Sequence, residues 1–182
     1  MEKASKLIPI PKIIEVSEEK KEIKMNFLNG KKLSGYLDKF PLKKQKSICR
    51  NIGVNVAKLH DSDIIHGDLT TSNMIYVGGK KPYNKKLVND KKQGAANLKI
   101  SLGRGGFKIY FIDFGLGFIS KKIEDKAVDL HLLKQALEAK HFKNWKVLFS
   151  ESLKGYSLSK NHQAVLKQLE KVEKRGRYKN SY

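Results

Sequence analysis

Two short segments of the sequence carry side chains suited to phosphoryl transfer. In residues 65–74, Ile-His-Gly-Asp-Leu-Thr-Thr-Ser-Asn-Met, Asp68 stands five positions before Asn73. In residues 109–115, Asp113 ends an apolar run and is followed by Phe-Gly. Because a phosphoryl group in transfer needs little covalent chemistry, catalysis depends on positioning and charge neutralisation. Asp68 could orient the attacking hydroxyl, and the oxygens of Asn73 and Asp113 could hold Mg²⁺, which prefers oxygen ligands.

The separate pieces of this pattern are weak signals. Asp-Phe-Gly occurs in many turns, Asp and Asn at this spacing often occur by chance, and a lone histidine such as His66 is more often packed than catalytic. The joint pattern is rarer, because it adds a helix before the first segment, apolar strands after it and a second aspartate at a strand end. Phosphoryl transfer is therefore the chemistry that the sequence favours.

Hydrophobic periodicity predicts the elements that must position these side chains. A helix is predicted over residues 42–60, whose apolar side chains repeat on one face: Ile48, Ile52, Val56 and Leu59. A short strand is predicted at 74–77, and the apolar run 109–113 is suited to a buried strand. The two chemical segments then lie in the loops beside these strands.

The flanking segments complete an α+β pattern in which helices dominate after residue 42. Residues 8–28 predict two strands joined by a turn at 17–20. Two helices are predicted further on, each with one apolar face: 125–140 with Val128, Leu132, Ala136 and Leu137, and 161–175 with Val165, Leu169 and Val172. The second of these is expected to end at Gly176, since glycine commonly follows a helix.

Residues 78–108 differ from the rest of the chain. They hold eight Lys and one Arg against one Asp, with six glycines and no sustained period. This composition predicts a solvated, disordered insertion. It could bind RNA, but we favour a lineage-specific expansion or unspliced sequence in the gene model.

The charge of the whole chain leaves two interpretations open. Lys and Arg number 38 against 18 Asp and Glu, which gives a net charge of +20. Such a balance favours a polyanionic partner, most simply nucleic acid. However, only four of the basic residues are Arg, the residue suited to bidentate contacts, and a Lys-rich chain also arises from genome-wide composition.

Length and composition exclude several classes of protein. The 182 residues predict one domain, or one and a fraction. No apolar run approaches the ~18 residues of a membrane span, and the first residues lack the apolar core of a secretory leader. A single cysteine, Cys49, cannot form an internal disulfide, which predicts a reducing compartment. A membrane protein, a secreted disulfide scaffold and a zinc-finger module are excluded.

The joint pattern resembles the catalytic lobe of the eukaryotic-like protein kinase superfamily. More specifically, the sequence is similar to the small atypical kinase subunit of the KEOPS (EKC) complex, the p53-related protein kinase family. The similarity rests on HGDLTTSNMI at 66–75, IDFGLGFIS at 112–120, EDKAVDL at 124–130 and VEKRGR at 172–177. It covers residues 7–76 and 109–178, without the basic insertion. That complex makes threonylcarbamoyladenosine on transfer RNAs that read ANN codons.

The resemblance implies a fold and a division of the chain. The fold is protein-kinase-like and α+β, mainly the helical C-lobe with a partial N-lobe sheet. Residues 1–27 are a remnant of the N-lobe, and residues 28–182 form the C-lobe with the insertion at 78–108.

The resemblance also implies roles for single residues. Asp68 is the catalytic aspartate, and Asn73 and Asp113 are the Mg²⁺ ligands in a site for ATP. Met25 is the gatekeeper, and the backbone of residues 26–28, from Asn26 to Leu28, is the hinge that reads adenine.

Other residues have implied structural or docking roles. Asp129 tethers the catalytic loop. Gly67 replaces the arginine that pairs with a phosphorylated activation loop in many kinases, and the stretch from Asp113 to Asp129 is short and lacks Ala-Pro-Glu. Arg175 and Arg177 resemble the basic tail that faces the threonylcarbamoyl-transferase partner and transfer RNA, although solubility explains an exposed tail equally well.

The largest departure from the family lies at the N-terminus. A kinase of this family begins with a glycine-rich strand pair, a strand lysine that anchors the phosphates and a helix glutamate, and none of them is found in this sequence. Residues 2–7 match only the end of that helix, and neither Lys12 nor Lys24 has the context of the phosphate-anchoring lysine. Losing such donors costs about 3–4 kcal/mol of transition-state stabilisation, by analogy with a deleted oxyanion donor. The chain as given is expected to bind ATP poorly and to expose one face of a half sheet. We favour an incomplete gene model or fragment over a truncated pseudokinase.

Three functions follow for testing. The first is an atypical serine/threonine kinase or ATPase that supports transfer RNA modification with the other KEOPS subunits, in the cytoplasm and also the nucleus. The second is a non-catalytic C-lobe scaffold that binds a partner or transfer RNA. The third is a small-molecule phosphotransferase, although those enzymes usually have His-Pro-Gly-Asn where this chain has residues 70–73, Thr-Thr-Ser-Asn.

Overall fold

The computed structural model describes residues 1–78 and 106–178, the last three of these as helix backbone only. In chain order the elements are α1 (Glu2–Ser5), β1 (Ile13–Ser17), β2 (Glu22–Met25), β3 (Lys31–Lys32), α2 (Leu33–Tyr36), the 3-10 helix η1 (Leu37–Lys39), α3 (Leu42–Asp61), β4 (Ile64–Ile65), the 3-10 helix η2 (Thr71–Asn73), β5 (Met74–Gly78), β6 (Phe107–Phe111), β7 (Phe118–Ile119), α4 (Ile123–Lys140), α5 (Trp145–Tyr156) and α6 (His162–Tyr178). The expected α+β class is confirmed.

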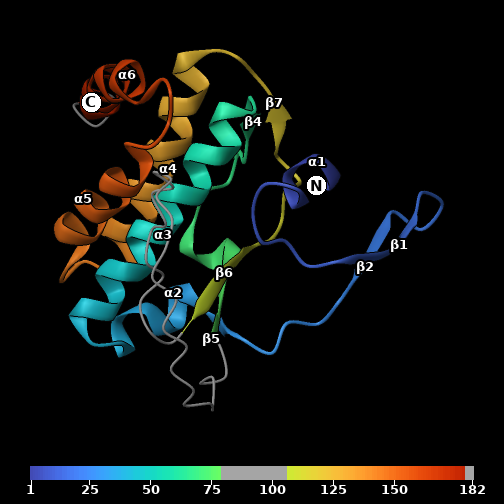
Figure 1. The fold of residues 1–182 in the computed structure, drawn as a ribbon. Coiled ribbons are helices and arrows are strands. Elements are labelled where there is room, and N and C mark those ends of the chain that lie inside the picture. Colours follow the sequence, from blue (N-terminus) through green and yellow to red (C-terminus); the bar gives the residue numbers. More distant parts are fainter. Residues whose placement is uncertain (79–105, 179–182) are drawn as a thin grey trace, which may run out of the picture.

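Four helices form the body of the molecule. α3 lies along α5, and α4 packs against α6 (Figure 1). The predicted apolar face of α3 is confirmed, because four residues on it have no exposed surface: Ile48, Ile52, Val56 and Leu59. α3 is therefore the central helix, and it leads directly into β4 and the Asp68 segment.

The contact between α3 and α5 depends on two glycines. A Cβ atom at Gly53 would lie 1.8 Å from the carbonyl oxygen of Ser152, and one at Gly155 would lie 2.0 Å from that of Arg50. Both separations are far below van der Waals contact, so neither position accommodates a side chain without moving a helix. The two backbones therefore meet more closely than ordinary helix packing allows.

Two predictions for the C-terminal helices are wrong in detail. The buried face of α4 contains Leu130, Leu133 and Leu137, whereas Val128 is 37% exposed and Leu132 only half-buried. Because apolar residues occur on several sides of this helix, periodicity alone does not select the face that the neighbours cover.

The end of the chain differs as well. α6 does not end at Gly176 but continues to Tyr178, since a glycine inside a helix is tolerated at a cost of about 1 kcal/mol. Its predicted face is confirmed, with Val165 and Leu169 buried and Val172 packed against the core. The sequence analysis missed α5 entirely.

Small sheets support the chemical segments. β3, β5 and β6 form one antiparallel sheet in that order, in which Met74 lies opposite Phe111. β4 pairs with β7, so that Ile65 lies opposite Phe118. The predicted strands at 74–77 and 109–113 are confirmed, although β6 begins and ends two residues earlier than predicted. Asp113 consequently lies in the loop after the strand.

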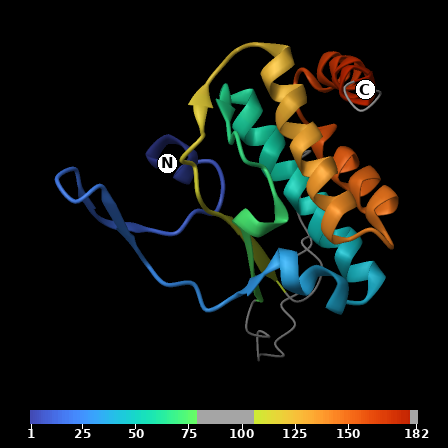
Figure 2. The ribbon, with the colours of Figure 1, turned by 180° about the vertical axis from the view of Figure 1, so that it is seen from behind.

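The N-terminal hairpin projects away from the helices in both views (Figures 1 and 2). β1 and β2 pair only with each other, as predicted, and Ile14, Val16 and Ile23 are each at least half exposed. The preceding segment behaves differently, since Ala4 and Ile8 are buried in the main core. The division of the chain at residue 27 stays a prediction.

The predicted basic insertion lies mostly outside the described residues. Its expected bounds, 78–108, are too wide, because Gly78 ends β5 and residues 107–108 begin β6. Across residues 1–78 and 106–178, no helix is both long and apolar enough to cross a membrane.

Candidate active site

The first chemical segment forms a tight loop between β4 and η2. The Asn73 side chain turns back on Asp68, and its Nδ2 donates to the Asp68 carboxylate at 2.7 Å and to the Asp68 carbonyl at 3.1 Å. Asn73 is buried and Asp68 half-buried. The spacing of five residues thus brings the two predicted side chains into direct contact.

Hydrogen bonds join this loop to the second chemical segment. The backbone N–H of Ile112 donates to the carbonyl of Asn73 at 3.0 Å, and His66 Nε2 lies 3.2 Å from the carbonyl of Ile112. The ring of His66 also packs on the ring of Phe114, with 4.4 Å between centroids. The residue before Asp113 and the residue after it are therefore both fixed to the Asp68 loop.

His66 uses both ring nitrogens as a neutral imidazole. Because a carbonyl can only accept, Nε2–H donates to Ile112, and Nδ1 then accepts from the backbone N–H of Asp68 at 3.3 Å. Burial lowers the pKa of His66, and it outweighs the opposite effect of the nearby Asp129, the Ile112 carbonyl, Asp68 and Asp113. A second proton would place an N–H against the Asp68 N–H, so His66 is a structural link.

Asp129 holds the start of the loop through hydrogen bonds to its backbone, which matches the predicted tethering role. Its side chain is fully buried on α4. Oδ2 accepts the backbone N–H of His66, Oδ1 accepts that of Gly67, both at 3.0 Å, and His60 Nε2 lies 3.1 Å from Oδ2. One carboxylate thereby satisfies two buried backbone donors and a buried ring.

A second histidine supports the far end of the loop. His141, at the end of α4, is 1% exposed. Its Nε2 lies 3.2 Å from the hydroxyl of Thr71, and its Nδ1 lies 2.9 Å from the carboxylate of Asp38. Thr71 begins η2, so this contact holds the turn that carries Asn73.

Gly67 is required by the close approach of the segment that follows Asp113. Its φ is 80°, a left-handed conformation that favours glycine, and a Cβ atom there would lie 2.2 Å from the carbonyl oxygen of Leu116. An arginine therefore does not fit in this arrangement. The segment is held nearby by the β4–β7 pairing and by the Ser120 N–H, which donates to the Asp63 carbonyl at 2.8 Å.

Asp113 has an unusual backbone and an exposed side chain. Its φ is 62°, a value that is rare for residues other than glycine. Residues in such conformations are found most often at functional sites. One carboxylate oxygen accepts the N–H of Gly115 at 3.3 Å. The conformation fits a carboxylate presented to a ligand.

The two predicted ligands carry oxygen atoms of the kind that Mg²⁺ prefers. Because Asn73 donates through its nitrogen, its amide oxygen is left for another partner, and the exposed Asp113 adds a carboxylate. Among the residues that the structure describes, no group of three or more His, Cys, Asp or Glu side chains could hold a metal ion. The predicted pair of ligands, with one amide and one carboxylate, would need water or a nucleotide to complete the coordination.

The predicted adenine-binding residues lie on the link between the hairpin and the body. Met25 ends β2, and the N–H of Asn26 donates to the carbonyl of Lys12 at 2.9 Å. Phe27 is 92% exposed, and Leu28 is half-buried. Among the described residues, no hydrogen bond or ion pair connects this segment to Asp68 or Asp113, and its adenine-binding role stays a prediction.

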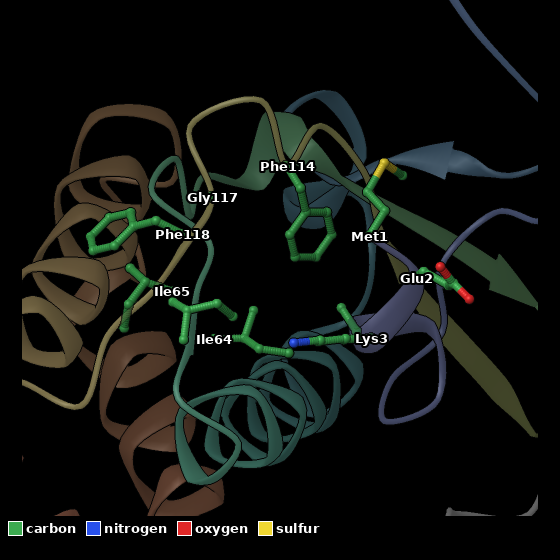
Figure 3. A pocket seen from close by; sticks show the side chains of 10 residues that line it. Met1, Glu2, Lys3, Ile64, Ile65, Phe114, Gly117 and Phe118 are labelled. Carbon is green, nitrogen blue, oxygen red and sulfur yellow. The ribbon is translucent and has the colours of Figure 1, made fainter. Parts of the chain in front are cut away.

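A cavity of about 290 Å³ lies on the other side of the second chemical segment (Figure 3). Its walls are residues 1–4 around α1, Ile64 and Ile65 of β4, and four residues after Asp113: Phe114, Gly117, Phe118 and Ile119. Phe114 and Lys3 point into it. Because Asp68, Asn73 and Asp113 do not line this cavity, it does not belong to the predicted phosphate site.

The predicted basic tail is partly engaged within the chain. Arg175, on α6, forms an ion pair with Glu124 at the start of α4, with 2.7 Å between Nη1 and Oε1, and Gln168 contacts the same carboxylate. The Arg175 side chain is still 66% exposed. The side chain of Arg177 lies outside the described part of the chain.

The sequence analysis missed the residues that support the loop from a distance. Tyr156 and Asp129 contact the two ring nitrogens of His60, and His141 contacts Thr71. These side chains come from separate helices and share no motif with the loop. His60 stands four positions after Val56 on the predicted apolar face of α3, and this spacing could have indicated that its ring is buried.

The architecture and the site define a protein of kinase-like fold. A solved structure of WaaP in complex with acyl carrier protein superimposes with a TM-score of 0.56 at 13% identity, covering 96% of this chain and 71% of the other. At this identity the likeness concerns the fold alone. A scan against models of protein families gives no match.

Sequence similarity to proteins of known family shows the family to which this chain belongs. The KEOPS complex subunit Bud32 of Pyrococcus abyssi is 34% identical over 94% of this chain and 67% of its own length. The EKC/KEOPS complex subunit bud32 of Dictyostelium discoideum is 32% identical over 96% of the chain and 61% of its own. The chain belongs to the Bud32 family of KEOPS kinase-like subunits, as the sequence motifs predict.

The chain matches only part of these relatives. A probable bifunctional tRNA threonylcarbamoyladenosine biosynthesis protein of Methanocaldococcus jannaschii is 36% identical over 94% of this chain but over 26% of its own length. The chain therefore spans about two thirds of the Pyrococcus protein and a quarter of the bifunctional one.

Proposed function

We propose that this chain is the ATP-using kinase-like subunit of a KEOPS complex, and that it transfers or hydrolyses the γ-phosphate of ATP in support of threonylcarbamoyladenosine formation on transfer RNA. One observation carries this proposal. Asp68 and Asn73 are in contact at 2.7 Å, in a loop that buried Asp129 fixes from below and that is bonded to the segment of Asp113.

The roles of the three side chains follow from their contacts. Asp68 accepts the proton of the attacking hydroxyl or water, and the Asn73 amide holds its carboxylate in place. The oxygens of Asn73 and Asp113 hold Mg²⁺, which would neutralise charge on the phosphates when ATP is bound. His66 stays neutral and keeps the two segments together.

The first test is ATP turnover by the chain purified with its native partners. Asp68→Asn should reduce phosphate release by about 100-fold or more, because a positioned base contributes about that factor, and Asp113→Ala should abolish it. Glu19→Ala, at an exposed position of the hairpin turn, is the matched acidic control and should leave turnover unchanged. Equal turnover in wild type and Asp113→Ala would reject the catalytic role.

A non-catalytic scaffold is the second candidate, favoured by the net charge of +20 and by the exposed N-terminal hairpin. It predicts transfer RNA binding that weakens steeply with salt, because bound phosphates release counterions. Binding that survives in Asp68→Asn, without any ATP turnover in wild type, would favour the scaffold. Absent or salt-insensitive binding would reject its RNA part.

The partners and location follow from the same proposal. The expected partners are the threonylcarbamoyl-transferase subunit and the other KEOPS subunits, and the exposed Arg175 is a candidate contact. A cytoplasmic or nuclear location fits a transfer RNA modifying complex. Loss of co-purification in Arg175→Glu, with unchanged thermal stability, would support this contact.

A further inference from the structure

Three buried polar side chains connect α5 to the loop of Asp68. The hydroxyl of Tyr156 lies 2.9 Å from Nδ1 of His60, and Nε2 of His60 lies 3.1 Å from Oδ2 of Asp129. Asp129 in turn accepts the backbone N–H groups of His66 and Gly67. The chain of contacts thus runs from the end of α5, through α3 and α4, to the two residues before Asp68.

The direction of each hydrogen bond follows from donor chemistry. Both oxygens of Asp129 already accept backbone N–H groups, so His60 meets Oδ2 as a donor through Nε2–H. In the tautomer that carries its proton on Nε2, Nδ1 is an acceptor, and the hydroxyl of Tyr156 donates to it. The tyrosine hydroxyl therefore gives the second ring nitrogen of His60 a partner and holds the ring in the orientation that points Nε2–H at Asp129.

Burial keeps water from taking the place of a missing hydrogen-bond partner in this network. Tyr156, His60 and Asp129 have no exposed surface, and burial raises the pKa of Tyr156 so that the hydroxyl keeps its proton. The ring of Tyr156 also meets the ring of His60 edge to face, with 5.4 Å between centroids. Partially satisfied buried networks are costly, so each member constrains the next.

The packing of α3 against α5 sets the position of the hydroxyl. Gly155 precedes Tyr156 in the sequence and lies against the backbone of Arg50 in α3. Gly53 lies against Ser152 one turn earlier on α5. This close contact brings the Tyr156 ring to the C-terminal end of α3, where His60 lies, and leaves little freedom for either side chain.

We propose that Tyr156 is a positioning residue, which orients the Asp68 loop through His60 and Asp129. The proposal rests on the proposed function, since the loop is catalytic only if the chain turns over ATP. Tyr156 itself does not touch the reacting groups. Removal of the Tyr156 hydroxyl should therefore shift the Asp68 loop and lower the rate of ATP turnover, while the affinity for ATP stays unchanged.

The test compares Tyr156→Phe with wild type in the chain purified with its native partners. The variant keeps the ring and loses only the hydroxyl. It should lower kcat about three- to ten-fold with little change in KM for ATP, the size expected for side chains coupled through one network. Tyr36→Phe, which removes an exposed tyrosine hydroxyl on α2, is the matched control and should leave both constants unchanged.

A double-mutant cycle asks whether the hydroxyl acts through His60. In a His60→Asn background, Tyr156→Phe should cause no further fall in kcat, because the connection is already broken. Additive losses in the two variants would overturn the proposal. So would an unchanged kcat in Tyr156→Phe while Asp68→Asn is inactive.

Nuclear magnetic resonance of the isotope-labelled chain gives a readout that needs no activity. In Tyr156→Phe, the Nδ1 signal of His60 should shift because this nitrogen loses its partner, and the amide signals of His66 and Gly67 should shift and exchange faster with solvent. These changes would support the positioning role even if wild type does not turn over ATP, which would reject only the proposed function. A lower melting temperature with unchanged amide signals would show a merely structural role and overturn the proposal.

Discussion

The N-terminal hairpin and the Asp68 loop are both short segments between regular elements, but they are stabilised in opposite ways. β1 and β2 pair only with each other, and their apolar side chains at Ile14, Val16 and Ile23 are largely exposed. The loop has little regular structure, yet two of its backbone N–H groups donate to one buried side chain of α4, Asp129. Regular hydrogen bonding in a strand is therefore no measure of how firmly a segment is held.

The difference indicates where changes should matter. An isolated two-stranded hairpin is at best marginally stable, because it buries little apolar surface. A loop fixed by a buried carboxylate loses several hydrogen bonds at once when that carboxylate is removed. Four changes, ordered by expected effect, test this contrast.

Asp129→Ala should have the largest effect. It leaves the N–H groups of His66 and Gly67 and the ring of His60 without their acceptor, which should cost about 3–5 kcal/mol of unfolding free energy, as for a broken buried pair. Urea denaturation measures the loss. Asp125→Ala, on the same helix and only half-buried, should cost less than about 1 kcal/mol. Equal losses in the two variants would contradict the special role of Asp129.

Gly155→Val tests the helix contact behind the loop. Its Cβ would lie 2.0 Å from the carbonyl oxygen of Arg50, so the helices must separate at a cost of about 2–3 kcal/mol. The melting temperature should fall accordingly. Gly35→Ala on α2, where a Cβ meets nothing within 4 Å, should be neutral or slightly stabilising. A stable Gly155→Val protein would show that α3 and α5 can shift freely.

The pH dependence of stability tests the neutral state of His66. Its pKa is lowered in the folded protein, so the unfolded chain binds more protons as the pH falls below the ordinary value of 6.5. Stability should therefore be full above about pH 7.5 and should decrease as the pH falls through 6.5 toward the folded pKa. His131, whose pKa burial also lowers, adds to the same slope.

Urea denaturation at several pH values between 7.5 and 5.5 measures this slope, a range set about one unit either side of the ordinary histidine pKa. His66→Gln, which keeps a donor for the Ile112 carbonyl, should flatten the slope in part. A slope that is the same in His66→Gln and wild type would show that His66 titrates normally.

Val16→Thr should have the smallest effect. The side chain is 59% exposed on β1, so the unfolding free energy should change by less than about 0.5 kcal/mol. Ile109→Thr, at a fully buried position of β6, is the matched substitution and should cost about 2–3 kcal/mol through lost apolar burial and a buried hydroxyl. A large loss in Val16→Thr would mean that the hairpin is packed in solution and would break the contrast.

The positions of secondary structure near the site could be predicted because they depend on local patterns. The face of α3, the hairpin at 13–25 and the strands on either side of the insertion follow from short-range periodicity. The face of α4 could not, since several sides are apolar and its neighbours decide which one is buried. α5 was missed, although it supplies Gly155 and Tyr156.

The sequence by itself determined the family and the three side chains of the candidate site, because Asp68, Asn73 and Asp113 lie within short motifs whose spacing follows from local backbone geometry. The tertiary structure alone decided what holds them. His60 and Tyr156 are 96 positions apart and His141 and Thr71 are 70 apart, and each pair meets only when the helices pack. It also decided that position 67 must be glycine, because the carbonyl of Leu116 occupies the space that a side chain would need.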